Sequence, residues 1–165
     1  MPLITNSRHY IVQKTVLAWD DFRIPSGSLE GLERNGLAGV PVIAVETEGA
    51  ASFNAAAKAG RVTPIARIES VATSLGAKQV CDQAVKYSGS RPVVSALVSD
   101  YEAVSASRNF ADDHRMVTEQ ACGAGLACFY GNKEVLAPFR NPLMIVCGGA
   151  TMSLEQLVSL HERFG

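Results

Sequence analysis

A cysteine followed by two glycines lies where the last apolar run of the chain ends. Cys147, Gly148 and Gly149 directly follow the apolar run 143–146, and Ser153 then precedes an amphipathic stretch. In open α/β sheets, ligands bind beyond the carboxyl ends of the strands and near the first turns of the following helices. The same residues would also suit a tight turn that holds no ligand. Both interpretations stay open on this motif alone.

The cysteines and histidines lack the spacing of a zinc site. No two cysteines have the C-x-x-C spacing, and three of the four lie in apolar or small-residue runs, where a reduced thiol packs as a small hydrophobe. We therefore expect free thiols that are neither zinc ligands nor disulfides: Cys81, Cys122, Cys128 and Cys147. The histidines stand in polar surroundings and are expected to be solvated surface residues: His9, His114 and His161.

Composition and charge indicate a globular protein of ordinary character. The chain has 165 residues, 47% of them apolar and 19% charged, and its formal net charge is −1. It has no basic run, so nucleic acids and anionic membranes are not expected partners. The N-terminus has no apolar signal region, and no segment approaches eighteen uninterrupted apolar residues. We expect a cytoplasmic protein.

Short apolar runs alternate with helical stretches from residue 41 onward, which predicts an α/β fold with a mostly parallel sheet flanked by helices. Residues 41–46 are a buried-strand candidate, and an alanine-rich helix over 50–60 ends at Gly60. Two further helices are expected near 70–75 and 78–87.

The second part of the chain continues this alternation. A strand over 92–99 leads into a helix that runs to about residue 113, with Ser99 and Glu102 at capping-box spacing. The remaining expected elements are a short strand at 115–117, a small-residue helix at 119–131, a buried strand at 143–149 and a last helix capped by Ser153 and Gln156. Residues 1–25 show no clean period, and only a helix around 29–34 is expected near them. We therefore divide the chain into a divergent segment, 1–25, and a domain, 26–165.

Three segments together resemble the L-serine dehydratases, or L-serine ammonia-lyases, of the fold-type II pyridoxal-phosphate enzymes, which are tryptophan synthase β-like. They are VPVIAVETEGAASFNAA (40–56), TEQACGAGLACFY (118–130) and MIVCGGATMSLEQL (144–157). Their order and spacing match that family, and the similarity extends from about residue 26 to the C-terminus. The resemblance implies a partial fold-type II large domain, the C-terminal half of such an enzyme.

The resemblance implies pyridoxal 5'-phosphate as cofactor and an amino acid as substrate. Cys147, with Gly148 beside it, corresponds to the family's cysteine facing the pyridine nitrogen, where a thiol does not stabilise a protonated ring. The family converts L-serine to pyruvate and ammonia, and its threonine-preferring relatives commonly have serine at this position. Cys147 therefore favours serine as the substrate. Without the resemblance, an inert buried thiol would be the simpler interpretation.

The resemblance also places a monovalent-cation site, for potassium, at Glu46, Ala50, Ser52, Leu75 and Ala77. A carboxylate, a hydroxyl and backbone carbonyls are hard oxygen donors that suit an alkali cation. Only Glu46 and Ser52 offer side-chain oxygens, so the other three would act through their carbonyls. Without the resemblance, Glu46 would be interpreted as a helix cap or a member of an ion pair.

Two catalytic features of the family are missing from the sequence. The Schiff-base lysine belongs to a serine-phenylalanine-lysine motif, and none of the five lysines has that context: Lys14, Lys58, Lys78, Lys86 and Lys133. The family's phosphate-binding glycine loop aligns with Asp20–Arg23, where carboxylates would repel phosphate and side chains would prevent its close approach. We therefore assign no catalytic residue and expect a truncated half that is inactive alone, with an exposed sheet edge and dependence on a partner chain.

Other functions stay open at this point. One is a non-catalytic binding or regulatory module that retains part of the fold, and another is a lyase similar to threonine dehydratase. The family is homodimeric, but the sequence does not show whether this chain is. Glu119 resembles a family residue packed near the cofactor, and the proline that usually follows it is here Gln120, which puts the rigidity of this loop in question.

Overall fold

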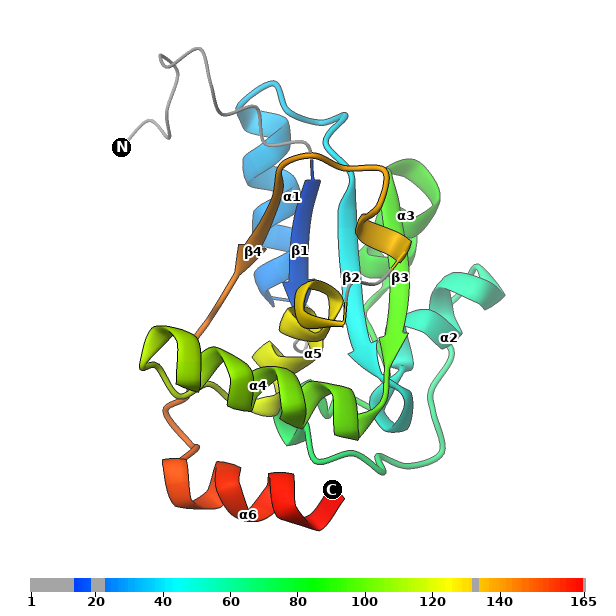
Figure 1. Cartoon of the computed structure of the whole chain (residues 1–165). Helices are drawn as coiled ribbons and strands as arrows, with labels where there is room; N and C mark the ends of the chain where they lie inside the picture. The colour runs from blue at the N-terminus through cyan, green and yellow to red at the C-terminus, as the bar shows by residue number, and fades with distance from the viewer. Residues whose placement is uncertain (1–13, 19–22, 132–133, 165) are drawn as a thin grey trace.

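A four-stranded parallel sheet in the order β3-β2-β1-β4 forms the centre of the molecule (Figure 1). The structure is a computed structural model, and it describes residues 14–18, 23–131 and 134–164. The strands are β1 Lys14–Ala18, β2 Val42–Thr47, β3 Val93–Val98 and β4 Pro142–Ile145. Every neighbouring pair is parallel. The predicted α/β class with a mostly parallel sheet is therefore confirmed.

Strand β2 is buried along its whole length because helices cover both faces of the sheet at this position. Its side chains alternate between the two faces, as they do in any strand. Ala44 packs with residues of the helices on one face, whereas Ile43 and Val45 belong to the larger core cluster on the other. This burial explains why the apolar run at 41–46 correctly predicted a strand.

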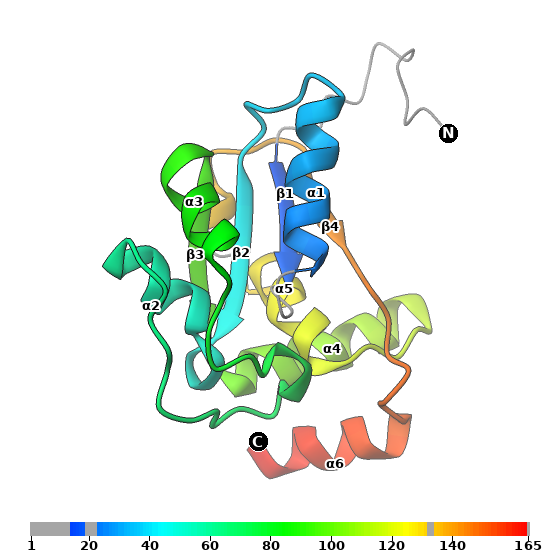
Figure 2. The same cartoon turned by 180° about the vertical axis from the view of Figure 1, so that it is seen from behind.

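Three helices cover the face of the sheet seen in Figure 2. They are α1 Arg23–Arg34, α2 Ser52–Ala59 and α3 Asp82–Ser90. Leu29 of α1 packs against Val42, and Phe53 of α2 packs in a cluster with Ala44 and Ala84. Helix α2 ends at Gly60 in the left-handed conformation, with φ of 64°, as its sequence predicted.

The opposite face is covered by α5, Gln120–Tyr130, on which α4, Asp100–His114, and then α6, Leu154–Phe164, are layered. Figure 1 shows α4 and α6 near the end of the sheet toward which the strands point. The capping box of α4 is formed as predicted, with Ser99 and Glu102 each bonding the other's backbone N–H. Ser153 and Gln156 do the same for α6. Within the described residues, no helix has the length and apolar character to span a bilayer.

The predicted helices at 70–75 and 78–87 need correction. Only a single 3-10 turn, η2 Thr73–Leu75, forms in the first range, and α3 starts at Asp82. Side chains bind the backbone before η2, because Asp100 accepts the N–H of Val71 and Ser70 accepts that of Ala72. Such side-chain contacts compete with helical hydrogen bonding, so the segment is a tethered loop.

Two strand predictions in the last third are also wrong in part. Residues 115–117 form no strand, because Arg115 takes a left-handed conformation with φ of 59° as it closes α4. Strand β4 ends at Ile145 and lies at an edge of the sheet, where Leu143 is 46% exposed. The predicted buried strand over 143–149 is therefore a shorter and half-exposed edge strand.

Strand β1, which lies between β2 and β4, was not predicted. Its residues pair with both neighbours, Val16 with Ile43 on one side and with Met144 on the other. The helix predicted around 29–34 begins earlier, at Arg23. Part of the divergent N-terminal segment thus contributes a central strand to the sheet.

The contact between α4 and α5 predicts opposite effects for alanine at two helical glycines. A Cβ at Gly123 would lie 2.2 Å from the carbonyl oxygen of Ala103, whereas one at Gly31 in α1 would meet no atom within 4 Å. Gly123→Ala should lower the free energy of unfolding by about 2 kcal/mol or more through overpacking. Gly31→Ala should raise it by about 0.5–1 kcal/mol through helix propensity. Urea denaturation of both variants measures these effects, and equal stabilities would contradict the close packing of α4 on α5.

Candidate functional site

The carboxyl ends of β1, β2 and β4 meet at one edge of the sheet, and two of the predicted site residues lie there. Glu46 is the fifth residue of β2, and Cys147 follows the end of β4 by two residues. Because β1 separates β2 from β4 and neighbouring strands are about 4.8 Å apart, the backbones of these two strands are roughly 10 Å apart. Asp20, Asp21 and Phe22, which the resemblance placed at the glycine loop, lie outside the described residues.

The turn that follows β4 presents open backbone at Gly148. Gly148 has φ of 139°, which favours glycine, and a Cβ there would meet no atom within 4 Å. Gly149 is different, because its Cβ would lie 2.3 Å from the carbonyl oxygen of Val117. One glycine therefore packs the turn against its neighbour, while the other leaves space through which a ligand could approach closely. Cys147 beside them is exposed rather than buried.

The buried thiol of Cys122 forms hydrogen bonds with the backbone of this turn. The backbone N–H of Cys147 donates to Sγ of Cys122 at 3.3 Å, and that thiol donates to the carbonyl of Gly148 at 3.5 Å. Cys122 lies in the first turn of α5 and is 3% exposed. Cys122 thus stabilises the Cys147–Gly149 turn.

Glu119 connects the same turn to η2. Its Oε1 accepts the N–H of Thr151 at 3.3 Å, and its Oε2 accepts the hydroxyl of Ser74 at 2.9 Å. Burial raises the pKa of Glu119, but the hydrogen bonds from Thr151 and Ser74 favour the ionised form and hold the pKa below its ordinary value of 4.5. Glu119 is therefore an ionised side chain at neutral pH, adjacent to the Cys147–Gly149 turn.

Glu46 is a buried carboxylate at the start of α2. It is 1% exposed, and its two oxygens accept the backbone N–H groups of Phe53 and Asn54, each at 2.8 Å. Burial raises the pKa of Glu46 to about 7, although both hydrogen bonds act to lower it. Among the described residues, no basic side chain forms an ion pair with it. The carboxylate thus caps a helix and also lacks a compensating positive charge.

The other residues predicted for a cation site come from three segments around Glu46. Ala50 lies in the 3-10 turn η1, Glu48–Ala50, and Ser52 is the buried first residue of α2. Leu75 and Ala50 are members of the same core cluster, and the N–H of Ala77 donates to the carbonyl of Leu75 at 2.9 Å. In the described ranges, no group of three or more His, Cys, Asp or Glu side chains could hold a metal ion. A cation here would rest on the Glu46 carboxylate, the Ser52 hydroxyl and backbone carbonyls.

A hydrogen-bonded chain that the sequence analysis did not identify holds the loop before η2 in place. Ser70 donates to Asp100 at 2.6 Å and lies 2.7 Å from the hydroxyl of Thr47, at the end of β2. The link between Ser74 and Glu119 was also missed. The residue types alone gave no signal, because each bond joins segments more than twenty residues apart in the sequence.

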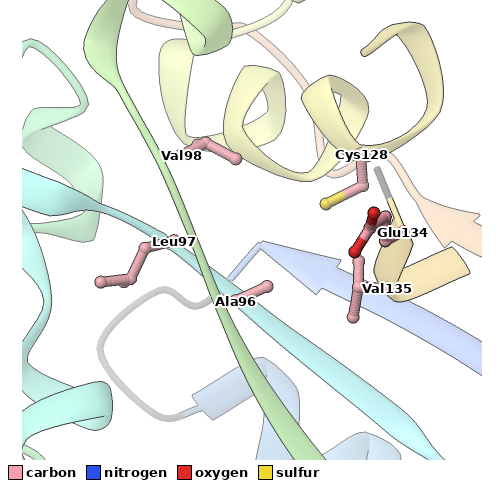
Figure 3. A pocket seen from close by; sticks show the side chains of 6 residues that line it. All are labelled: Ala96, Leu97, Val98, Cys128, Glu134 and Val135. Carbon is pink, nitrogen blue, oxygen red and sulfur yellow. The ribbon is translucent and has the colours of Figure 1, made fainter. Parts of the chain in front are cut away.

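A pocket elsewhere on the surface does not coincide with these residues. It has a volume of about 340 Å³ and lies between the edge strand β3, the end of α5 and the 3-10 turn η3, Glu134–Leu136 (Figure 3). Ala96 and Val98 point toward Cys128, while Leu97 points to the other side of the strand. No predicted site residue lines this pocket, and its one carboxylate, Glu134, has no partner group there that would suggest chemistry.

Gln120, which stands where the family usually has proline, is a poor fit to its surroundings. It is 2% exposed, and its Nε2 has no hydrogen-bond acceptor. It is the first residue of α5, where proline is favoured, and Glu119 has the extended conformation that a following proline requires, with φ of −72° and ψ of 158°. Gln120→Pro should therefore raise the free energy of unfolding by about 1–2 kcal/mol.

Thermal and urea denaturation of the Gln120→Pro variant test this prediction. Gln156→Pro is the control in which proline should be unfavourable, because Gln156 lies inside α6 and its N–H donates to the Ser153 hydroxyl at 3.1 Å. That variant should lose stability. A loss of stability in Gln120→Pro as well would contradict the described start of α5.

Comparison with known proteins adds to this geometry. The family model for pyridoxal-phosphate dependent enzymes matches residues 23–148. Human L-serine dehydratase/L-threonine deaminase is 44% identical over 147 residues, which are 84% of this chain and 45% of that protein. An L-serine dehydratase of Saccharomyces cerevisiae is 34% identical over 142 residues, 81% of this chain and 42% of that protein.

Solved structures give the same result. A fungal L-serine ammonia-lyase from Rhizomucor miehei superposes with a TM-score of 0.89 at 30% identity, over 93% of this chain and 50% of that one. Maize serine racemase shares the fold, with a TM-score of 0.74 at 16% identity, over 92% of this chain and 48% of that one. The chain thus spans about half the length of the relatives that it matches. On the family match and this fold, the chain belongs to the pyridoxal-phosphate dependent enzymes.

Proposed function

We propose that this chain forms the C-terminal half of the catalytic domain of a pyridoxal-phosphate dependent L-serine ammonia-lyase, which converts L-serine to pyruvate and ammonia. The observation that carries the proposal is the open turn at Cys147 and Gly148, which lies at the carboxyl ends of parallel strands and is fixed from two sides. Its position agrees with the ligand sites of open α/β sheets. The serine dehydratases and the fungal ammonia-lyase among the relatives support the choice of reaction.

The residues of this turn fit pyridoxal phosphate. Gly148 lacks the side chain that would block a flat ring, and Cys147 is exposed beside it. When bound, the cofactor supplies an electron sink for the substrate's α-carbon, which permits loss of the α-proton and then of the β-hydroxyl. The role proposed for Cys147 is to face the pyridine nitrogen with a thiol, which does not stabilise a protonated ring as a carboxylate would. Ser74 and Glu119 would lie nearby and fix the turn.

We further propose that the 165-residue chain is inactive by itself. The three lysines with described side chains, Lys58, Lys78 and Lys86, are all exposed, and none belongs to the turns described above. In our proposal none of these three lysines attaches the cofactor covalently, and Asp20 and Asp21, in the segment aligned with the glycine loop, would repel its phosphate. The other half of the catalytic domain would then supply the lysine and the phosphate site. For the assembled protein, we propose the homodimer of the family.

A cytoplasmic location is part of the same proposal. The proposed substrate, a free amino acid, is compatible with this location.

A monovalent cation, potassium in our proposal, would complete the surroundings of Glu46. The donor set of Glu46, Ser52 and the carbonyls of Ala50, Leu75 and Ala77 consists of hard oxygens. The raised pKa of Glu46 supports the proposal, because a buried carboxylate without a positive neighbour is costly to ionise. A cation at this position would lower that cost and would link the end of β2 to the loop around η2.

A chimera tests the proposed reaction. Residues 26–165 would replace the matching C-terminal part of human L-serine dehydratase, which supplies the missing half. The chimera should bind pyridoxal phosphate and release pyruvate from L-serine faster than 2-oxobutyrate from L-threonine. Cys147→Asp in the chimera should change the absorbance of the bound cofactor and its pH dependence, because a carboxylate would favour a protonated ring nitrogen.

The isolated chain is the control for the chimera. It should release no pyruvate, and borohydride should trap no stoichiometric cofactor on any of its lysines. A folded chimera that holds the cofactor but produces neither keto acid would contradict the proposed reaction. Activity of the isolated chain would contradict its proposed dependence on a second half.

The pKa of Glu46 predicts a pH-dependent stability that potassium changes. Since the folded pKa of about 7 lies above the ordinary value of 4.5, the folded state binds the proton more tightly. This contribution is full below about pH 4.5 and is lost as the pH rises to about 7, by roughly 2–3 kcal/mol of unfolding free energy. Potassium should flatten the slope, because it favours the ionised carboxylate.

Urea denaturation between pH 4.5 and 8 measures this slope in potassium chloride and in tetramethylammonium chloride of equal ionic strength. The difference between the wild type and Glu46→Gln isolates the contribution of this one group. An identical slope in both proteins would show that Glu46 does not titrate in this range, and an identical slope in both salts would exclude a potassium site at Glu46.

A further inference from the structure

Glu119 makes contacts with four separate parts of the chain, one of which is α4, where the Ser107 hydroxyl donates to the Glu119 carbonyl at 3.5 Å. Its carboxylate accepts the hydroxyl of Ser74 in η2 and the N–H of Thr151 in the turn after β4. Its own N–H donates to the carbonyl of Gly148 at 3.1 Å, and its carbonyl accepts the N–H of Gly123 in α5 at 3.0 Å. One residue therefore joins η2, α4, the start of α5 and the segment 147–151.

The Glu119 carboxylate neither caps α5 nor forms a salt bridge within the described residues. Glu119 is the N-cap residue of α5, yet its side chain makes no capping hydrogen bond. In the described part of the chain it also takes part in no salt bridge. Each oxygen instead accepts from a different segment, and charge-assisted hydrogen bonds of this kind are stronger than neutral ones. Its lowered pKa agrees with an ionised acceptor.

The two segments that it joins are those in which the proposed ligands would lie. Ser74 is adjacent to Leu75, whose carbonyl belongs to the proposed cation site. Thr151 closes the turn that begins at Cys147, where we placed the cofactor. Glu69, Ser70 and Asp100 tether the start of the η2 loop, whereas Glu119 joins its end to the turn after β4.

We propose that Glu119 is a positioning residue that couples the η2 turn to the Cys147–Thr151 turn, so that a change at either turn is transmitted to the other. A role of this coupling in catalysis rests on the function proposed above, whereas the coupling of the two turns does not. In the assembled enzyme, the link would let occupation of the Glu46 cation site adjust the position of Cys147 against the cofactor. Glu119 would act through these turns without touching the reacting atoms.

Amide hydrogen exchange by NMR on the isotope-labelled 165-residue chain tests the link without any ligand. Ser74→Ala removes a hydroxyl that donates to Glu119 and belongs to η2 rather than to the turn that contains Thr151. If Glu119 couples the two turns, the amide of Thr151 should exchange about three- to tenfold faster in this variant. Ser88→Ala is the matched control, because it removes a part-buried hydroxyl that donates within α3 to the carbonyl of Val85 at 2.8 Å. It should leave Thr151 unchanged.

Two substitutions of Glu119 separate coupling from a general loss of stability. Glu119→Ala removes both acceptors and should accelerate Thr151 exchange, and Ser74→Ala should then add no further effect. Glu119→Gln should restore protection, because its Oε1 can accept from Thr151 while its Nε2 donates to the Ser74 hydroxyl. Melting temperatures measured in parallel show whether any change reflects global unfolding.

Unchanged Thr151 exchange in Ser74→Ala would overturn the proposal, and so would additive effects of Ser74→Ala and Glu119→Ala. Failure of Glu119→Gln to restore protection would also overturn it. The experiment contains no cofactor, cation or substrate, so an inactive chimera would refute the proposed function and leave this result interpretable. Conversely, an active chimera with uncoupled turns would refute only the positioning role of Glu119.

Discussion

The parallel pairing of β1 with both β2 and β4 is the constraint on which the rest of the structure depends. It brings the ends of three strands to one edge, with Glu46 and Cys147 on opposite sides of a single strand. The helices can then cover both faces, which buries β2 completely and leaves the turns after the strands as the available surface. The position of the proposed site therefore follows from strand order before any side-chain chemistry is considered.

Glu46 and Glu119, the two carboxylates near this edge, differ in pKa because their surroundings differ. Glu46 is almost fully buried, and burial outweighs its two backbone hydrogen bonds, so its pKa rises to about 7. Glu119 is less buried, and the donors from Ser74 and Thr151 outweigh the cost of burial, so its pKa falls. Glu46 has no ion-pair partner among the described residues, whereas Glu119 is an acceptor that holds two turns.

Local sequence patterns predicted those parts of the fold that local interactions determine. The capping boxes at Ser99 and Ser153, the left-handed end at Gly60 and the buried run of β2 depend on neighbours within a few residues. Strand β1 escaped prediction because its position depends on pairing with strands that lie far away in the sequence. The prediction of a helix at 70–75 was wrong because a distant side chain, Asp100, accepts the N–H of Val71. For the site, the resemblance selected Cys147 and Glu46, but the bond between Ser74 and Glu119 spans 45 residues and had no local signal.

In our proposal the Cys147–Gly149 turn forms the cofactor end of the site, and chemical-shift mapping tests this position. Pyridoxine 5'-phosphate lacks the aldehyde that would react with lysines, so its titration into the isotope-labelled, cofactor-free chimera reports non-covalent binding. Saturable shifts are expected at the amides of Cys147, Gly148 and Glu119, with none at Ala96 or Val98 in the pocket beside β3. Saturable shifts confined to that pocket would contradict it.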